Sequence, residues 1–155
     1  KKSGKPIVYV NVSGSCVNLE KQKEECNALL QCFYPGAEGG DALAEILYGE
    51  VSPSGRLPLT FYKDCSELPN IEDYSMKNRT YRFYEGKPVY EFGYGLTYSD
   101  ISEEWIDENT VKVENKGNYD TGYSILKFEN KPHKRLVDFK KIFIRKGECA
   151  EVKFS

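Results

Sequence analysis

The N-terminal part of the chain alternates short apolar runs with charged segments. Residues 6–12 form an apolar, β-branched run between a proline and a glycine, which predicts a strand buried on both faces, as in a parallel sheet. Residues 19–25 are charged and helix-permissive, and they predict a short surface helix. A second apolar run, residues 28–34, ends at a Pro-Gly pair.

The same alternation continues through the next stretch. Residues 42–48 carry apolar side chains at helical spacing behind Asp41, whose charge suits the first turn of a helix. After turn-forming residues at 51–55, the run 57–62 returns to a strand pattern, although Pro58 restricts it to an edge or a strand start. Strands that alternate with helices predict βαβ units and an α/β layer.

The composition changes after Tyr62. Residues 63–99 are rich in aromatic residues, Gly and Pro, which predicts an extended, loop-dominated segment packed on a neighbour. From Ile101 onward, short apolar runs alternate with turn signals, which favours a β-sandwich. This part has about half of the roughly 100 residues of such a sandwich, so we expect a truncated one. The expected strands are 111–115, 123–128, 140–144 and 150–154.

Composition narrows the classes of partner. The 155 residues carry 22 Lys and Arg against 24 Asp and Glu, a net charge of -2, with the signs interleaved. A non-specific nucleic-acid binder would show a basic excess, and no apolar run approaches the roughly 20 residues that cross a bilayer. No leader-like apolar stretch follows the N-terminal lysines, and the first residue is not Met. We therefore expect a piece of a longer chain, without nucleic-acid or membrane partners.

Five cysteines and one histidine offer little metal or redox chemistry. The cysteines are irregularly spaced without a C-x-x-C pair, which argues against zinc and against a disulfide framework. They predict reduced thiols that act as small buried apolar residues and favour a cytoplasmic location, while a Cys26–Cys32 disulfide stays open. His133 lies in a polar stretch and predicts a solvated loop residue; Asn11 and Asn78 each begin an Asn-X-Ser/Thr sequence. The cysteines are Cys16, Cys26, Cys32, Cys65 and Cys149.

Carboxylates that could perform acid–base work lie at three places. Glu38 and Asp41 stand at the head of the predicted helix, where capping and dipole roles are favoured over general acid–base catalysis. The other candidates are adjacent pairs, which point apart on a strand and face solvent. These pairs are Glu72-Asp73 and Glu103-Glu104.

A dense aromatic set offers two interpretations. Exposed rings can stack on sugar rings, whereas packing between domains is the favoured alternative. Gly93 and Gly95 form a Gly-x-Gly sequence without the third glycine or the helix of a nucleotide-binding loop, which favours tight backbone between packed rings. The aromatic set comprises Tyr74, Tyr81, Phe83, Tyr84, Tyr90, Phe92, Tyr94 and Tyr98.

Several short sequence motifs are distinctive in combination: QCFYPGAEGGDALA at 31–44, GEVSPSGRLPLTFY at 49–62, RTYRFY at 79–84 and YEFGYGLTY at 90–98. Together they resemble the C-terminal portion of glycoside hydrolase family 3 and are most similar to its xylan 1,4-β-xylosidase branch. Later words, such as RLVDFKKI at 135–142, resemble the fibronectin type III-like domain that often follows. The resemblance implies the C-terminal part of an α/β-sandwich domain at 1–62, an aromatic-rich linker at 63–99 and a truncated fibronectin type III-like domain at 100–155.

The resemblance also implies a function for the parent protein. Family members are retaining exo-glycosidases that release sugars, here xylose from xylo-oligosaccharides, and retention needs two carboxylates about 5–5.5 Å apart. In the family, the nucleophilic Asp lies on a preceding (β/α)8 barrel. The acid/base Glu lies on a loop N-terminal to the region that residues 6–10 resemble. We therefore expect no catalytic residue, no metal ligand and no cofactor in this chain, and its substrate-binding residues stay unknown.

Two alternatives and one structural role stay open. A β-glucosidase of the same family would share these words. A carbohydrate-binding module would stack exposed Tyr rings and Trp105 on xylan, and a protein–protein module would use an open sandwich edge. Arg56, Arg79 and Arg82, set among aromatic and acidic residues, are expected to anchor the linker through bidentate and stacked contacts.

Overall fold

The computed structural model describes residues 4–155 and divides them into two compact units. Among the described residues, the first unit contains 4–42 and 57–94, and the second contains 43–56 and 95–155. Because residues 1–3 are not described, the start of the predicted first part and of the N-terminal lysine stretch lies outside the described residues. The predicted boundaries at 62 and 99 stay predictions.

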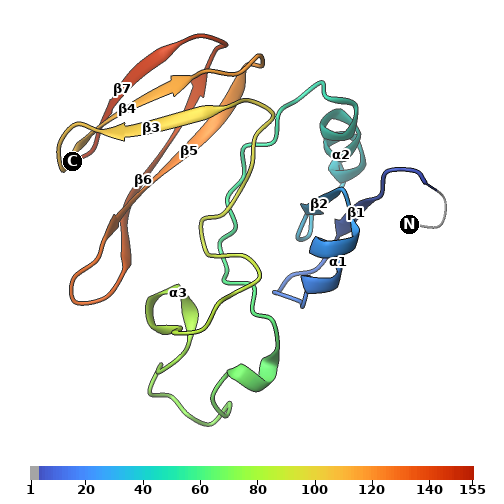
Figure 1. Cartoon of the computed structure of the whole chain (residues 1–155), viewed down its shortest axis with the longest axis vertical. Helices are drawn as coiled ribbons and strands as arrows, with labels where there is room; N and C mark the ends of the chain where they lie inside the picture. The colour runs from blue at the N-terminus through green and yellow to red at the C-terminus, as the bar shows by residue number, and fades with distance from the viewer. Residues whose placement is uncertain (1–3) are drawn as a thin grey trace. The chain divides into compact units, whose positions relative to one another are not determined.

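The first unit is built around a parallel pair of strands (Figure 1). Strand β1 (Val8–Asn11) pairs with β2 (Ala28–Gln31), and helix α1 (Glu20–Glu25) connects them. Helix α2 (Gly39–Tyr48) begins in this unit and ends in the second one. The βαβ order and both predicted helices are confirmed, and α2 starts three residues earlier than its apolar spacing suggested.

Two strand predictions in this unit are wrong. Residues 6–12 are not buried on both faces: Val8 is 46% exposed and only Asn11 of β1 is buried. The sheet has two strands among the described residues, and Tyr9, on the face opposite Val8, packs against the apolar cluster. Residues 57–62 form no strand, since Pro58 cannot donate to a ladder. A single antiparallel bridge remains, between Phe61 and Tyr90.

The rest of the first unit is mostly irregular, as predicted for the aromatic-rich segment. It contains a 3-10 turn, η1 (Cys65–Glu67), and one helical turn, α3 (Thr80–Phe83). A small core forms where the two stretches of chain meet: Leu19, Phe61 and Val89 are buried, with Tyr9 and Leu57 among the residues packed against them.

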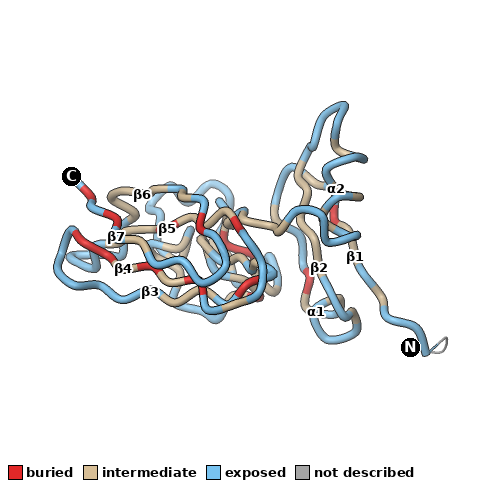
Figure 2. Tube along the Cα trace, turned by 90° about the horizontal axis from the view of Figure 1, so that it is seen from above, coloured by how far each residue is buried: buried red, intermediate tan, exposed pale blue. Residues whose placement is uncertain are grey.

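The second unit is antiparallel and holds most of the buried apolar residues (Figure 2). One sheet has the order β3-β4-β7 and the other pairs β5 with β6. The strands are β3 (Ile101–Trp105), β4 (Thr110–Asn115), β5 (Thr121–Glu129), β6 (Arg135–Ile144) and β7 (Cys149–Lys153). Val111, Val113, Ile125, Ile144, Val152 and Phe154 form the buried cluster.

This arrangement confirms the predicted fold class, an α/β part followed by an all-β sandwich. All four expected strands are present. The largest shift is in β6, which begins five residues before the predicted 140–144 because the alternating pattern extends back to Arg135 opposite Glu129.

Candidate functional site

The carboxylates considered for acid–base work lie on exposed positions. Asp41 occupies the first turn of α2, where its charge suits the helix dipole, and Glu38 immediately precedes that helix. Asp73 accepts a hydrogen bond from the Ser75 backbone N–H at 2.9 Å, which lowers the pKa of Asp73. These geometries support capping and turn formation.

The remaining acidic candidates are also explained by local structure. Glu72 is exposed beside the Asp73 turn, and Glu103 and Glu104 are exposed on β3. Glu103 bonds to the Tyr123 phenol. Within residues 4–155, no group of three His, Cys, Asp or Glu side chains could hold a metal ion.

Most rings of the aromatic set pack on other rings. In the first unit, Tyr81 stacks on Phe92 with centroids 4.2 Å apart, and Tyr90 lies 5.0 Å from Tyr94. Lys23 adds a cation over the Tyr90 ring at 4.9 Å. These rings pack within one unit, so the predicted packing between domains stays a prediction. Tyr74, which is 89% exposed, is the clear exception.

Tyr62 and Tyr84 organise the linker around α3. Their rings meet edge to face at 4.9 Å, and the Tyr62 hydroxyl accepts a hydrogen bond from the Thr80 backbone N–H at 2.8 Å. The Tyr84 hydroxyl donates to the Glu67 carboxylate, and this bond, with a smaller effect of burial, raises the pKa of Tyr84 to about 12. Sequence reasoning missed Glu67, because its partner is distant in the chain and no local pattern marks it.

The three arginines differ in the groups that their side chains contact. Arg56 lies over the Tyr123 ring at 4.7 Å and donates to the Gly95 and Ser124 carbonyls at 2.5 and 3.2 Å, so its anchoring role is confirmed. Its hydrogen-bond partners are two backbone carbonyls, so the expected bidentate contact with a carboxylate is not formed. Arg79 donates to the Pro69 and Asn70 carbonyls, and so ties the linker to itself. Arg82 is exposed and lies over the ring of its neighbour Phe83, at 5.2 Å.

A hydroxyl network continues the Arg56 contacts within the second unit. Thr121 donates to Ser52, which is also 2.9 Å from the Thr97 hydroxyl. Gly95 lies beside this network, and a Cβ there would meet the Gly55 carbonyl oxygen at 2.2 Å. The predicted backbone role of this glycine is therefore confirmed, and Gly93 adds a left-handed φ of 83°.

The cysteine predictions are confirmed in part. All five thiols are free, so Cys26 and Cys32 form no disulfide. None is buried, however: Cys65 and Cys149 are exposed and the others are half-buried, because they lie at turns and strand ends rather than inside the two small cores. His133 is exposed between β5 and β6, as predicted for a loop residue.

The side-chain amides of the asparagines in both Asn-X-Ser/Thr sequences are hydrogen-bonded within the chain. The Asn11 side chain is buried and donates to Ser13 and Gln31. The Asn78 side chain donates to the Glu67 carbonyl at 2.6 Å and accepts from the Glu85 N–H. These bonds give both asparagines a structural role.

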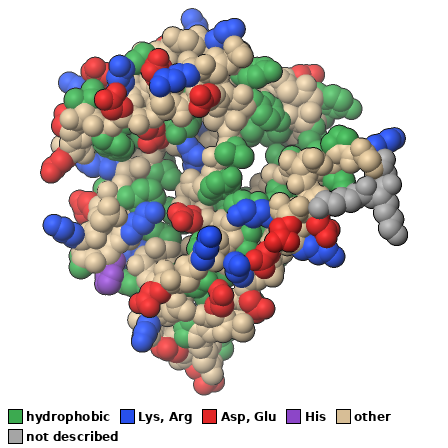
Figure 3. Space-filling view, viewed as in Figure 1, with side chains coloured by type: hydrophobic (Ala, Val, Ile, Leu, Met, Phe, Trp, Pro, Cys, Tyr) green, Lys and Arg blue, Asp and Glu red, His purple; other side chains and the backbone are tan. Residues whose placement is uncertain are grey.

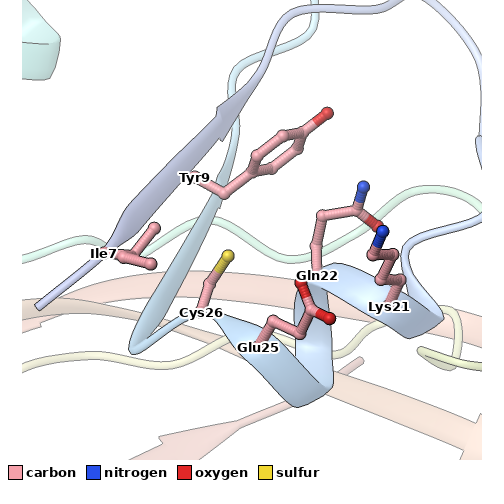
Figure 4. A pocket seen from close by; sticks show the side chains of 6 residues that line it. All are labelled: Ile7, Tyr9, Lys21, Gln22, Glu25 and Cys26. Atoms are coloured by element: carbon pink, nitrogen blue, oxygen red, sulfur yellow. The ribbon is translucent and has the colours of Figure 1, made fainter. Parts of the chain in front are cut away.

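A shallow pocket of about 340 Å³ opens between β1 and α1 (Figure 4). Ile7, Tyr9 and Cys26 give it an apolar wall, and Lys21, Gln22 and Glu25 of α1 contribute polar groups. Glu25 is the one carboxylate in this lining, whereas a retaining glycosidase needs two. This pocket therefore does not meet the requirements of the implied reaction.

Charges are mixed on the surface, and the helices are short. On the face shown in Figure 3, acidic and basic side chains are interleaved. Among residues 4–155, no helix is both long enough and apolar enough to cross a membrane. The described residues thus form a parallel α/β part and an antiparallel sandwich, and the absence of a catalytic residue stays a prediction.

Comparisons with known proteins identify this region. Residues 1–98 match the glycosyl hydrolase family 3 C-terminal domain. The chain therefore belongs to that family. It is 38% identical over 97% of its length to a xylan 1,4-β-xylosidase of Xylanibacter ruminicola, and 29% identical over 99% to a periplasmic β-glucosidase of Salmonella typhimurium. It spans only 19% and 24% of those two proteins.

Solved structures give the same assignment. A family 3 exo-β-xylosidase in complex with a xylobiose aziridine probe matches 97% of the chain with a TM-score of 0.86 and 26% identity. The β-glucosidase 3B of Thermotoga neapolitana matches 97% with a TM-score of 0.80 and 27% identity. The chain covers 26% of each of these structures.

Proposed function

We propose that this chain is the C-terminal segment of a retaining family 3 exo-glycosidase of the β-xylosidase type, which releases xylose from the non-reducing end of xylo-oligosaccharides. The observation that carries the proposal is the match over nearly the whole chain to a xylan 1,4-β-xylosidase at 38% identity. Several other relatives are also named as β-xylosidases.

The catalytic carboxylates belong to other parts of this enzyme. The chain spans about a fifth to a quarter of its relatives, and its own candidate carboxylates are exposed caps and turn residues. The nucleophilic Asp and the acid/base Glu are assigned to the preceding barrel and to an upstream loop. Other parts of the parent enzyme would also cover the parallel pair, because a parallel sheet is stable when both faces are covered and Val8 is 46% exposed.

A β-glucosidase of the same family is the second candidate. It is favoured by the 29% identity to the Salmonella enzyme over 99% of the chain. An independent carbohydrate-binding module using Trp105 is less well supported, since this ring stacks on Phe154 at 5.5 Å.

The proposal is tested on the polypeptide encoded by the complete reading frame that contains this sequence. It should hydrolyse a chromogenic β-xyloside faster than the matching β-glucoside, with retention of anomeric configuration. The reverse preference would favour the β-glucosidase, and no hydrolysis of either substrate would overturn the proposal.

A chimera provides the matched control. Replacing the corresponding segment of the Xylanibacter ruminicola enzyme with residues 1–155 should preserve its activity, because the segment is assigned a supporting role. Deleting that segment should abolish folding or activity. A functional enzyme without it would contradict the proposed role.

A further inference from the structure

Strand β6 carries two phenylalanines that face solvent. Phe139 is 66% exposed and Phe143 is 67% exposed, and Lys141 lies between them, also exposed. Residues at alternate positions of a strand share a face, so these three side chains form one stripe, here called the β6 stripe. Ile142 and Ile144, at the intervening positions, pack on or within the sandwich core.

The sequence around the stripe is rich in cations. Residues 134–146 contain six cations and a single acid, Asp138, although the carboxylates of Glu148 and Asp120 accept hydrogen bonds from the backbone N–H groups of Arg145 and Lys146. Some cations are engaged: Arg135 pairs with Glu129 at 2.9 Å, and Lys140 donates to the Lys153 carbonyl. No ion pair among residues 4–155 reaches Lys141. The cations are Lys134, Arg135, Lys140, Lys141, Arg145 and Lys146.

A second copy of the chain fits this surface poorly. Antiparallel pairing of two β6 edges about Lys141 would place Phe139 opposite Phe143, but it would also set the two lysines directly opposite each other. Like charges in that position destabilise a pair, and lysines on edge strands oppose such pairing. The stripe instead suits a ligand with an apolar face for the rings and an anionic group for Lys141.

The geometry points to an extended, acidic β-linked glycan as that ligand: a xylan chain with uronic acid substituents. The C–H face of a pyranose ring can stack on Phe139 and Phe143, which are about 13 Å apart along the strand, a span of several sugar rings. A substituent carboxylate would pair with Lys141. The inference rests on the proposed function, because that function supplies xylan as the class of polymer.

Binding is measured by affinity electrophoresis of the full polypeptide in gels that contain glucuronoxylan, neutral arabinoxylan or polygalacturonate. We expect retardation by glucuronoxylan, weaker retardation by arabinoxylan and none by polygalacturonate. F139S/F143S should weaken glucuronoxylan binding about tenfold, in keeping with the loss of two aromatic platforms. K141E should remove the preference for the acidic xylan over the neutral one, and so should salt at 1 M, where the Debye length is about 3 Å.

Exposed residues of the first unit provide matched controls. Tyr74→Ser and Lys77→Glu change the same chemical types outside strand β6 and should leave retardation unchanged. Equal retardation of the wild type and F139S/F143S, with unchanged unfolding temperatures, would overturn the inference. So would equal binding to polygalacturonate, or a wild-type dimer that the stripe variants convert to a monomer.

The binding readout needs no catalysis, so the two proposals fail separately. Lost retardation with intact β-xyloside hydrolysis would reject the stripe alone. Retardation without hydrolysis of any β-glycoside would reject the proposed function and leave the glycan site.

Discussion

The two units bury their residues in different ways. In the second unit, β4 alone places Val111 and Val113 in a core that also receives β5, β6 and β7. In the first unit, the parallel pair buries only Asn11, and the apolar cluster lies where loops meet, at Leu19, Phe61 and Val89. Two sheets that face each other can close a core, whereas two parallel strands expose a face.

This difference indicates how each unit is stabilised. The second unit has a connected polar and apolar interior, so local changes there should unfold the whole unit. The first unit is held by ring pairs, turns and single hydrogen bonds, each of which contributes little alone. We therefore expect its stability to depend on the rest of the parent enzyme, as the proposed function requires.

Removing a buried asparagine from each unit should give the largest difference in lost free energy of unfolding. Asn115 is fully buried; its amide donates to the Tyr119 and Ile144 carbonyls, and its oxygen accepts from Ser99. Asn115→Ala leaves these groups unpaired and should destabilise the second unit by about 3 kcal/mol. Asn11→Ala removes bonds to the Ser13 and Gln31 side chains, which are themselves only half-buried, and should cost about 1 kcal/mol.

Chemical denaturation, followed by hydrogen exchange of β4 and β1 amides, measures both effects. Similar losses of free energy of unfolding in the two alanine variants would contradict the expected difference in stability between the units. Conservative Asn→Asp variants at each position keep the size of the side chain and control for cavity effects.

A smaller contrast is expected between two arginines. Arg56→Ala removes a stacked contact and two hydrogen bonds to carbonyls, and should cost about 2 kcal/mol. Arg82→Ala removes one exposed stacked contact and should cost about 0.5 kcal/mol. In the intact enzyme, both variants should lower the unfolding temperature more than the turnover number. A loss of turnover at unchanged stability would assign the arginine a role in the site instead.

Two tyrosines offer the finest comparison. The pKa of Tyr123 is raised to about 12, mainly by burial and secondly by its bond to Glu103. The pKa of Tyr84 reaches about 12 mainly through its bond to Glu67. Glu67→Gln should therefore return Tyr84 most of the way to its ordinary range, whereas Glu103→Gln should leave most of the Tyr123 shift.

Phenolate absorbance against pH measures these shifts, with Tyr84→Phe and Tyr123→Phe to assign the transitions. The sign for stability follows from proton binding. Between pH about 10 and about 12, the unfolded chain has lost a phenolic proton that the folded chain keeps, so stability falls as pH rises through this interval. Tyr123→Phe should reduce that fall in the second unit. An unchanged pH profile would show that burial does not set this pKa.

Much of the fold could be predicted from local patterns. Alternation located β4, β5 and β7, and helical spacing behind Asp41 located α2. The strand expected at 57–62 does not form, because Pro58 has no backbone N–H to donate to a strand ladder even within an apolar run. The burial of β1 could not be predicted from its composition, since exposure depends on which layers cover a sheet.

The contacts of the site were less accessible to sequence reasoning. Arg56 could be singled out as an anchor, but its partners Gly95 and Ser124 lie far along the chain and are backbone carbonyls, which no residue type marks. The Tyr84–Glu67 bond is hidden for the same reason. The segments that resemble the family, 49–62 and 90–98, contain both Arg56 and Gly95, so the resemblance marked this region where no single residue type did.

The central claim is that this chain supports catalysis without performing it. Its most direct test is hydrolysis of a chromogenic β-xyloside by the purified 155-residue chain, beside a β-glucoside and a protein-free control. We expect no turnover of either substrate. Reproducible turnover that disappears on Glu38→Gln would contradict it, because a catalytic carboxylate would then lie within these residues.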